Sequence, residues 1–141
     1  MAPGELTQQM SRCELFQDFS DEELQRVAYR MEEDHFPKRT EILKEGEEGM
    51  GFFFVVLDGT ARVNQHGQEV ATLKAGDFFG EITSLNGGPR TASVTTIEAL
   101  WVLRLTAADF RVFLEDNPTI MFRILEKVCT RFQALATNAG S

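Results

Sequence analysis

A carboxylate and a guanidinium stand at the two ends of a short segment that has the residue types needed to bind an anion. Gly80 and Glu81 open the segment, and Arg90 follows the stop signal formed by residues 86–89. A glycine at a helix start lets the backbone approach a ligand, and the N–H groups there attract anions. Glu81 can accept hydrogen bonds from sugar hydroxyls, whereas Arg90 offers a planar pair of donors that fits a phosphate. Together these residues predict a cradle for a nucleoside monophosphate.

The same two charged side chains have a simpler interpretation, a surface ion pair, which contributes little to stability. Composition alone favours that interpretation, but the order of residues favours the ligand site. Phe-Gly-Glu is followed by a short helical segment and then by Pro-Arg-Thr-Ala-Ser-Val, within residues 78–94. This order resembles the phosphate-binding cassette of cyclic nucleotide-binding domains. That family includes regulatory subunits of cyclic-nucleotide-dependent kinases, cyclic-nucleotide-gated channels and the catabolite activator protein.

The resemblance runs in order from about Leu15 to Leu135 and implies a role for each matched residue. Gly80 and Glu81 match the positions that bind the ribose 2′-hydroxyl, and Arg90 matches the arginine that pairs with the cyclic phosphate. The positions around the sugar and phosphate are Ile82, Thr83, Thr91 and Ala92, and the apolar positions beside the base are Val70 and Leu73.

Thr91 bears on the choice of base. In the cyclic-GMP kinase and the gated channels a threonine follows the arginine, and its hydroxyl can meet the guanine amino group. Some channels with this threonine nevertheless prefer cyclic AMP. The resemblance therefore implies a regulatory sensor that binds cyclic AMP, with appreciable binding of cyclic GMP.

The sequence departs from the family pattern in three places. Arg39-Thr40 replaces Gly-Glu before the second strand, and Met50-Gly51 replaces Gly-Asp before the third. Thr83 stands where the family usually has alanine. The first two departures fall in turns and leave the loop geometry open, while the third preserves a backbone N–H.

Residues 35–105 have a sequence pattern typical of short strands separated by glycine turns. The run 52–57 and the alternation at 60–65 suit strands, and Asp58-Gly59 and His66-Gly67 predict hairpins. Most connections are too short for a crossover helix, so the sheet should be antiparallel. We therefore predict an α+β fold: an antiparallel β-roll or jelly roll (double-stranded β-helix) with flanking helices, forming a single domain over 1–141.

Helical patterns flank the strands over about residues 5–32 and 106–136. Ser20 and Glu23 predict a capping box, and Thr106 predicts a second cap. The final helix carries a heptad-like stripe: Met121, Leu125, Val128, Phe132 and Leu135. Packing on the β-roll explains this stripe most simply. A dimer seam, or closure over the ligand as in the family, remains open.

Composition limits the other functional classes. The chain has 43% hydrophobic and 26% charged residues, which suits one soluble domain with a real core. Its net charge of −8, without a Lys/Arg run, argues against nucleic acid as a direct ligand. We also expect no DNA binding because the chain ends at Ser141, shortly after the final helix.

Residues for metal or covalent chemistry are sparse. His35 and His66 are the only histidines, Cys13 and Cys129 lie far apart, and no nucleophile stands in a recognisable setting. We therefore expect no catalytic residue, metal or cofactor, and a cupin-like metalloenzyme is the weaker alternative. A degenerate β-roll that only contacts proteins is the other. The chain lacks a long apolar run, so we expect a cytoplasmic protein without membrane contact, whose partners are a nucleotide and a second copy or an effector.

Overall fold

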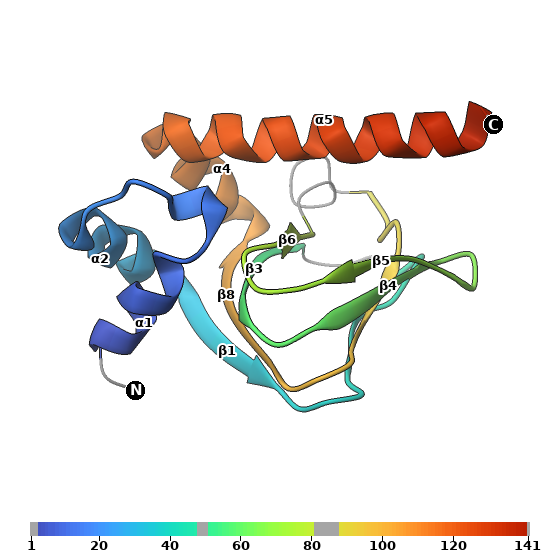
Figure 1. The fold of residues 1–141 in the computed structure, drawn as a ribbon, viewed down its shortest axis with the longest axis horizontal. Helices are drawn as coiled ribbons and strands as arrows, with labels where there is room; N and C mark the ends of the chain where they lie inside the picture. The colour runs from blue at the N-terminus through green and yellow to red at the C-terminus, as the bar shows by residue number, and fades with distance from the viewer. Residues whose placement is uncertain (1–2, 48–50, 81–87, 141) are drawn as a thin grey trace.

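The computed structural model describes residues 3–47, 51–80 and 88–140, with the side chains of Pro3 and of residues 135–140 left undescribed. Within this part of the chain, two four-stranded antiparallel sheets form the centre, in the orders β1-β8-β3-β6 and β2-β7-β4-β5. Helices pack outside them (Figure 1). The predicted antiparallel α+β architecture is therefore confirmed. The first sheet contains β1 (Glu32–Phe36), β8 (Leu100–Thr106), β3 (Phe52–Asp58) and β6 (Phe78–Phe79), and the second contains β2 (Glu41–Leu43), β7 (Ser93–Thr96), β4 (Ala61–Gln65) and β5 (Gln68–Leu73).

Strand β3 is buried on both faces, which explains why its sequence is a continuous apolar run instead of an alternation. Phe53, Val55 and Leu57 point into a cluster with the helices. Phe54 and Val56 point into a second cluster, between the two sheets. The strand therefore separates a helix-facing core from a sheet-facing core.

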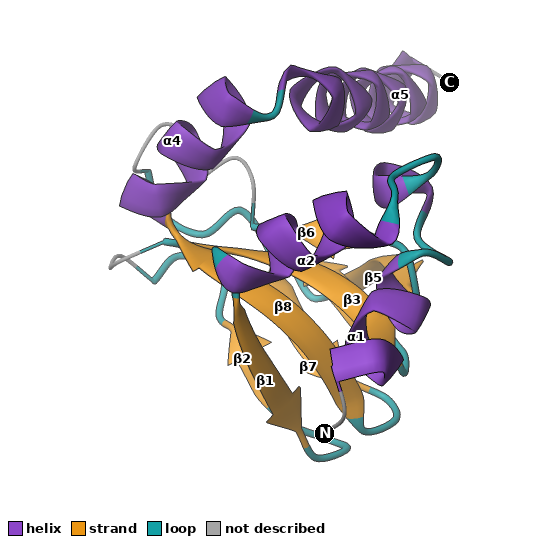
Figure 2. Cartoon of the chain, turned by 90° about the vertical axis from the view of Figure 1, so that its left-hand side faces the viewer, coloured by secondary structure: helices purple, strands orange, loops and turns teal. Residues whose placement is uncertain are grey.

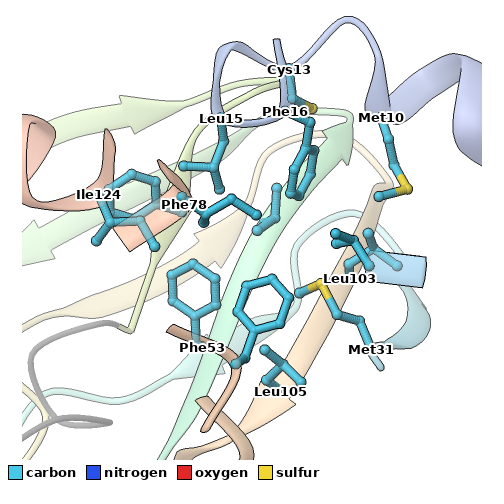
Figure 3. Packing of buried hydrophobic residues seen from close by; sticks show 14 of the residues in the cluster. Met10, Cys13, Leu15, Phe16, Met31, Phe53, Phe78, Leu103, Leu105 and Ile124 are labelled. Atoms are coloured by element: carbon cyan, nitrogen blue, oxygen red, sulfur yellow. The ribbon is translucent and has the colours of Figure 1, made fainter. Parts of the chain in front are cut away.

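The helix-facing core contains residues from both ends of the chain (Figure 3). The ring of Phe53 stacks on Phe110, with centroids 4.2 Å apart, and Met10 and Phe16 are at most 1% exposed. Figure 2 shows the N-terminal helices on the side of β3 and β8. These helices are α1 (Pro3–Met10), η1 (Glu14–Phe16) and α2 (Asp21–Tyr29), and the C-terminal ones are α4 (Ala107–Asp116) and α5 (Pro118–Gly140).

Both predicted helix caps are confirmed. Ser20 and Glu23 exchange side-chain and backbone hydrogen bonds, each 3.1 Å long, at the start of α2. The hydroxyl of Thr106 accepts a 3.2 Å hydrogen bond from the N–H of Asp109. These bonds satisfy N–H groups that the helix itself leaves without partners.

The prediction that the apolar stripe of the final helix packs on the β-roll is largely wrong. Met121, Leu125 and Phe132 are 37%, 53% and 71% exposed, and of the described stripe only Val128 packs partly on the core. In the part of α5 whose side chains are described, the buried ones are instead Ile120 and Ile124, on the adjoining face. Two apolar stripes lie side by side on this helix, and their spacing alone does not show which one faces the core.

Two boundaries also differ from the predictions. Strand β1 begins at Glu32, before the expected start of the β-roll near residue 35. The prediction missed these first residues because they are polar and mostly exposed, so they show no strand pattern. The Asp58-Gly59 turn does not form a hairpin, since it links β3 in one sheet to β4 in the other. Gly59 has φ +95°, and a Cβ there would clash with the carbonyl of Ala99. The His66-Gly67 turn does join the paired strands β4 and β5, as predicted.

The departure at Arg39-Thr40 is accommodated without loss of the turn. Arg39 takes φ 61°, in the left-handed region that glycine adopts most readily. Its N–H donates to the Thr96 carbonyl at 3.0 Å, and the N–H of Thr40 donates to the Thr96 hydroxyl at 2.8 Å. Met50, from the second departure, lies outside the described residues.

Candidate functional site

The second sheet and helix α5 enclose a cavity of about 450 Å³. This volume falls within the range of small-molecule sites. In Figure 1, α5 crosses one side of the molecule beside β4, β5 and β6. The predicted site residues that line the cavity are Val70, Leu73, Gly80, Arg90, Thr91 and Ala92. The remaining three, Glu81, Ile82 and Thr83, lie outside the described residues.

Arg90 is held at the cavity by its backbone. Its N–H donates to the Glu47 carbonyl at 3.0 Å, and its carbonyl accepts from the N–H of Gly46 at 2.8 Å. Burial lowers the pKa of the Arg90 guanidinium, while the nearby Glu47 carboxylate raises it. A guanidinium remains cationic at neutral pH. The cavity therefore presents a partly desolvated positive charge, and an anion is attracted to such a charge more strongly than in bulk water.

Gly80 is required at its position for two reasons. Its φ is +84°, and a Cβ would clash with the carbonyl oxygen of Phe52. From the sequence, we expected this glycine to permit the close approach of a ligand. In the structure the close approach is to the Phe52 carbonyl of β3.

The rest of the cavity wall is mainly apolar. Leu73 is buried, and Val70 is 48% exposed, with its side chain at the cavity. Additional strand residues at the wall, which the sequence analysis did not identify, are Leu43, Val63, Gln65, Ala71, Phe79 and Val94. Alternation along β4, β5 and β7 would have indicated one shared face, but not that this face lines a cavity.

Helix α5 supplies the opposite wall through Val128, Arg131, Phe132 and Ala134. The Arg131 guanidinium donates to the Phe78 carbonyl at 2.7 Å and lies 4.6 Å from the centroid of the Phe78 ring. Nearer its start, α5 is attached to the N-terminal region, since Arg123 donates to the carbonyls of Leu15 and Gln17 at 3.0 and 2.8 Å. Only the position of the helix brings these side chains to the site.

A larger hollow, of about 780 Å³, lies between α2 and the start of α5. The ion pair of Arg30 and Asp116, 3.3 Å apart, lies at this hollow. The residues that line this larger hollow include none of the predicted site residues. We therefore place the candidate ligand site in the smaller cavity, where the cationic and apolar groups converge.

Neither histidine lies at the cavity. His35 stacks on Trp101 with centroids 5.8 Å apart, and His66 lies 3.2 Å from a carboxylate oxygen of Glu45. Among the described residues, no three His, Cys, Asp or Glu side chains gather as metal ligands would. In the described part of the chain, no helix has both the length and the apolar character needed to cross a membrane.

A β-roll with an arginine-centred, apolar-walled cavity beside a C-terminal helix defines a small-ligand-binding module. The chain belongs to the cyclic nucleotide-binding domain family, whose model matches residues 33–117. The resemblance expected from the cassette is thus confirmed.

Related sequences include regulatory proteins of two kinds. A cAMP-dependent protein kinase regulatory subunit of Pyricularia oryzae is 32% identical over 140 residues, covering 91% of this chain and 34% of the relative. A CRP-like cAMP-activated global transcriptional regulator of Mycobacterium tuberculosis is 23% identical, covering 92% and 59%. The chain spans about a third or less of the kinase regulatory subunits that it matches.

Solved structures agree on the fold. The catabolite activator protein of Thermus thermophilus superposes with a TM-score of 0.78 at 24% identity, covering 89% of this chain and 61% of that one. The cAMP-bound PfPKA-R (141-441) superposes with a TM-score of 0.80 at 25% identity, covering 98% and 47%. These likenesses confirm the predicted β-roll with flanking helices.

Proposed function

We propose that the cavity binds a cyclic nucleoside monophosphate, with cyclic AMP as the first ligand and appreciable affinity for cyclic GMP. The observation that carries the proposal is the partly buried Arg90 guanidinium in a cavity with otherwise mainly apolar walls. A cyclic nucleotide carries one negative charge on its phosphate, which can pair with Arg90, and a flat base, which can pack against apolar side chains. Relatives that are named for cyclic AMP support this choice of ligand.

Each part of the nucleotide has a proposed partner. Arg90 and the N–H groups of Thr91 and Ala92 would hold the phosphate, while Val70 and Leu73 flank the base. Following the resemblance, Gly80 and Glu81 would bind the ribose 2′-hydroxyl, with Ile82 and Thr83 beside it. Each of these roles is a binding role, so we propose a binding module that is not an enzyme and needs no metal or other cofactor.

Signalling would pass through α5. The helix forms one wall of the cavity and contacts the N-terminal region through Arg123, so it connects the ligand site to the helical layer. A nucleotide that binds better when α5 is closed shifts the population toward that state. The output would then reach an effector or a second copy of the chain, in the cytoplasm.

Calorimetric titration of Arg90→Ala with both nucleotides tests the proposal. Removing the partner of a desolvated phosphate should cost about 2–5 kcal/mol of binding free energy. Arg62→Ala is the matched control, because Arg62 pairs with Glu69 at 3.3 Å and lies outside the cavity. Circular dichroism should show both variants folded.

Two results would contradict the proposal. Wild-type affinity in Arg90→Ala would show that this guanidinium does not hold the phosphate. Absence of heat for the unmodified protein with either nucleotide would favour the alternative, a degenerate domain that contacts only proteins.

A further inference from the structure

Gln65 is a polar side chain of the cavity wall that the assignment of site residues did not include. It is the last residue of β4, and it lines the cavity. Its amide Nε2 donates a 3.1 Å hydrogen bond to the carbonyl oxygen of Thr91, a residue 26 positions away in the sequence. Thr91 directly follows Arg90, so Gln65 is attached to the part of the site proposed to hold the phosphate.

The bond occurs where the strand ladder stops. Strands β4 and β7 pair from Ala61 opposite Thr96 to Asn64 opposite Ser93. Gln65 lies one residue beyond the last pair, so its side chain continues the link after the backbone ladder has ended. The segment before β7 is therefore tied to β4 by a side chain that can be replaced without removing a ladder bond.

The bond also determines the direction of a backbone donor. The Thr91 carbonyl and the Ala92 N–H belong to one peptide unit, and the described residues contain no cis bond. A trans peptide is planar, with its carbonyl and N–H pointing in opposite directions. By holding the carbonyl, Gln65 makes the N–H of Ala92 point away from β4.

We propose that Gln65 is a positioning residue that sets the preference of the site between guanine and adenine nucleotides; this inference rests on the proposed function. Through the Thr91–Ala92 peptide, Gln65 orients the Ala92 N–H, which both nucleotides use for the phosphate. Through the same peptide it orients the Thr91 hydroxyl, which only the guanine amino group uses. Loss of Gln65 therefore weakens both ligands, and cyclic GMP more than cyclic AMP.

A purely structural role makes a different prediction. If Gln65 only joined the β4–β5 hairpin to β7, its loss would lower stability and leave the ratio of the two dissociation constants unchanged. Gln68 is a matched control, since it lies opposite Gln65 in the same hairpin, is exposed and does not line the cavity.

The experiment compares Gln65→Met with Gln68→Met by calorimetry. Methionine has nearly the length of glutamine but lacks the amide donor. Loss of one hydrogen-bonded contact corresponds to about a fivefold change in affinity. We expect Gln65→Met to weaken cyclic AMP by about threefold to fivefold and cyclic GMP by about tenfold or more. Gln68→Met should retain both affinities.

A double-mutant cycle tests the route through Thr91. In a Thr91→Ala background, Gln65→Met should weaken the two nucleotides equally, because the hydroxyl that distinguishes them is absent. In the nucleotide-free protein, the Ala92 amide resonance should move in Gln65→Met and stay in place in Gln68→Met.

An unchanged ratio of dissociation constants in Gln65→Met, or an unmoved Ala92 resonance, would overturn this inference while leaving the proposed function intact. Failure of the unmodified protein to bind either nucleotide would overturn both. The amide resonance needs no ligand, so the two failures are distinguishable.

Discussion

The guanidinium of Arg131 lies 4.6 Å from the ring centroid of Phe78 and donates to the carbonyl of the same residue at 2.7 Å. This relationship attaches the middle of α5 to β6, the strand that leads directly into Gly80. Each contact alone is modest in strength, but together they combine a charge-assisted hydrogen bond with a cation–π contact. The helix that forms one wall of the cavity is thus bound to the strand that begins the cassette.

Arg131→Ala should loosen α5 over the cavity. We expect faster amide hydrogen exchange in the second half of α5, because the attachment to Phe78 is lost, and nucleotide affinity lower by about 1–2 kcal/mol. Lys127→Ala, on an exposed part of the same helix, is the control. Unchanged exchange in Arg131→Ala would mean that other contacts hold the helix in place.

Phe132→Ala should weaken nucleotide binding without destabilising the fold. The ring is 71% exposed but lines the cavity, where it is available to pack against a base. Stacking of a base on an aromatic ring is worth about 1–3 kcal/mol. Phe122→Ala is a close control, because Phe122 is 59% exposed on the same helix and does not line the cavity. Equal affinities for the two variants would remove Phe132 from the site.

Thr91→Ala should reduce cyclic-GMP affinity more than cyclic-AMP affinity. The Thr91 side chain is at the cavity, and a contact between its hydroxyl and the guanine amino group would contribute about 1 kcal/mol. Competition titrations with both nucleotides measure the difference directly. A parallel loss for both ligands would show that the hydroxyl does not select the base.

Cys13 should make the fold less stable as the solution becomes alkaline. Burial chiefly raises the pKa of this thiol to about 11, from an ordinary value of 9.0. Between these two pH values the unfolded chain releases the proton and the folded chain retains it. The free energy of unfolding should therefore fall as pH rises from about 9 to about 11, by on the order of 2 kcal/mol.

Denaturant titrations at several pH values measure this effect. Cys13→Ala should flatten the decline, whatever its effect at neutral pH, whereas Cys129→Ala should preserve it because that thiol is exposed. An identical slope in Cys13→Ala and the unmodified protein would assign the alkaline instability to other groups.

Local sequence was sufficient for the elements whose signals lie within a few residues. Neighbouring residues determine the capping box at Ser20 and Glu23 and the turn at His66-Gly67. The apolar run of β3 is itself a local sequence signal, and it matches the burial of that strand on both faces. The predicted site residues of the cassette that the structure describes, Gly80, Arg90, Thr91 and Ala92, were also found from their order in the chain, and they line one cavity.

Tertiary structure decided which faces and which distant residues meet. The spacing on α5 was compatible with two faces, and only packing shows that Ile120 and Ile124 are buried while Phe132 lies at the cavity. The contact of Gln65 with Thr91 likewise depends on β4 and β7 being neighbours. Helical or strand periodicity specifies a repeat along one element, whereas the orientation of that element is set by the surface against which it buries its apolar side chains.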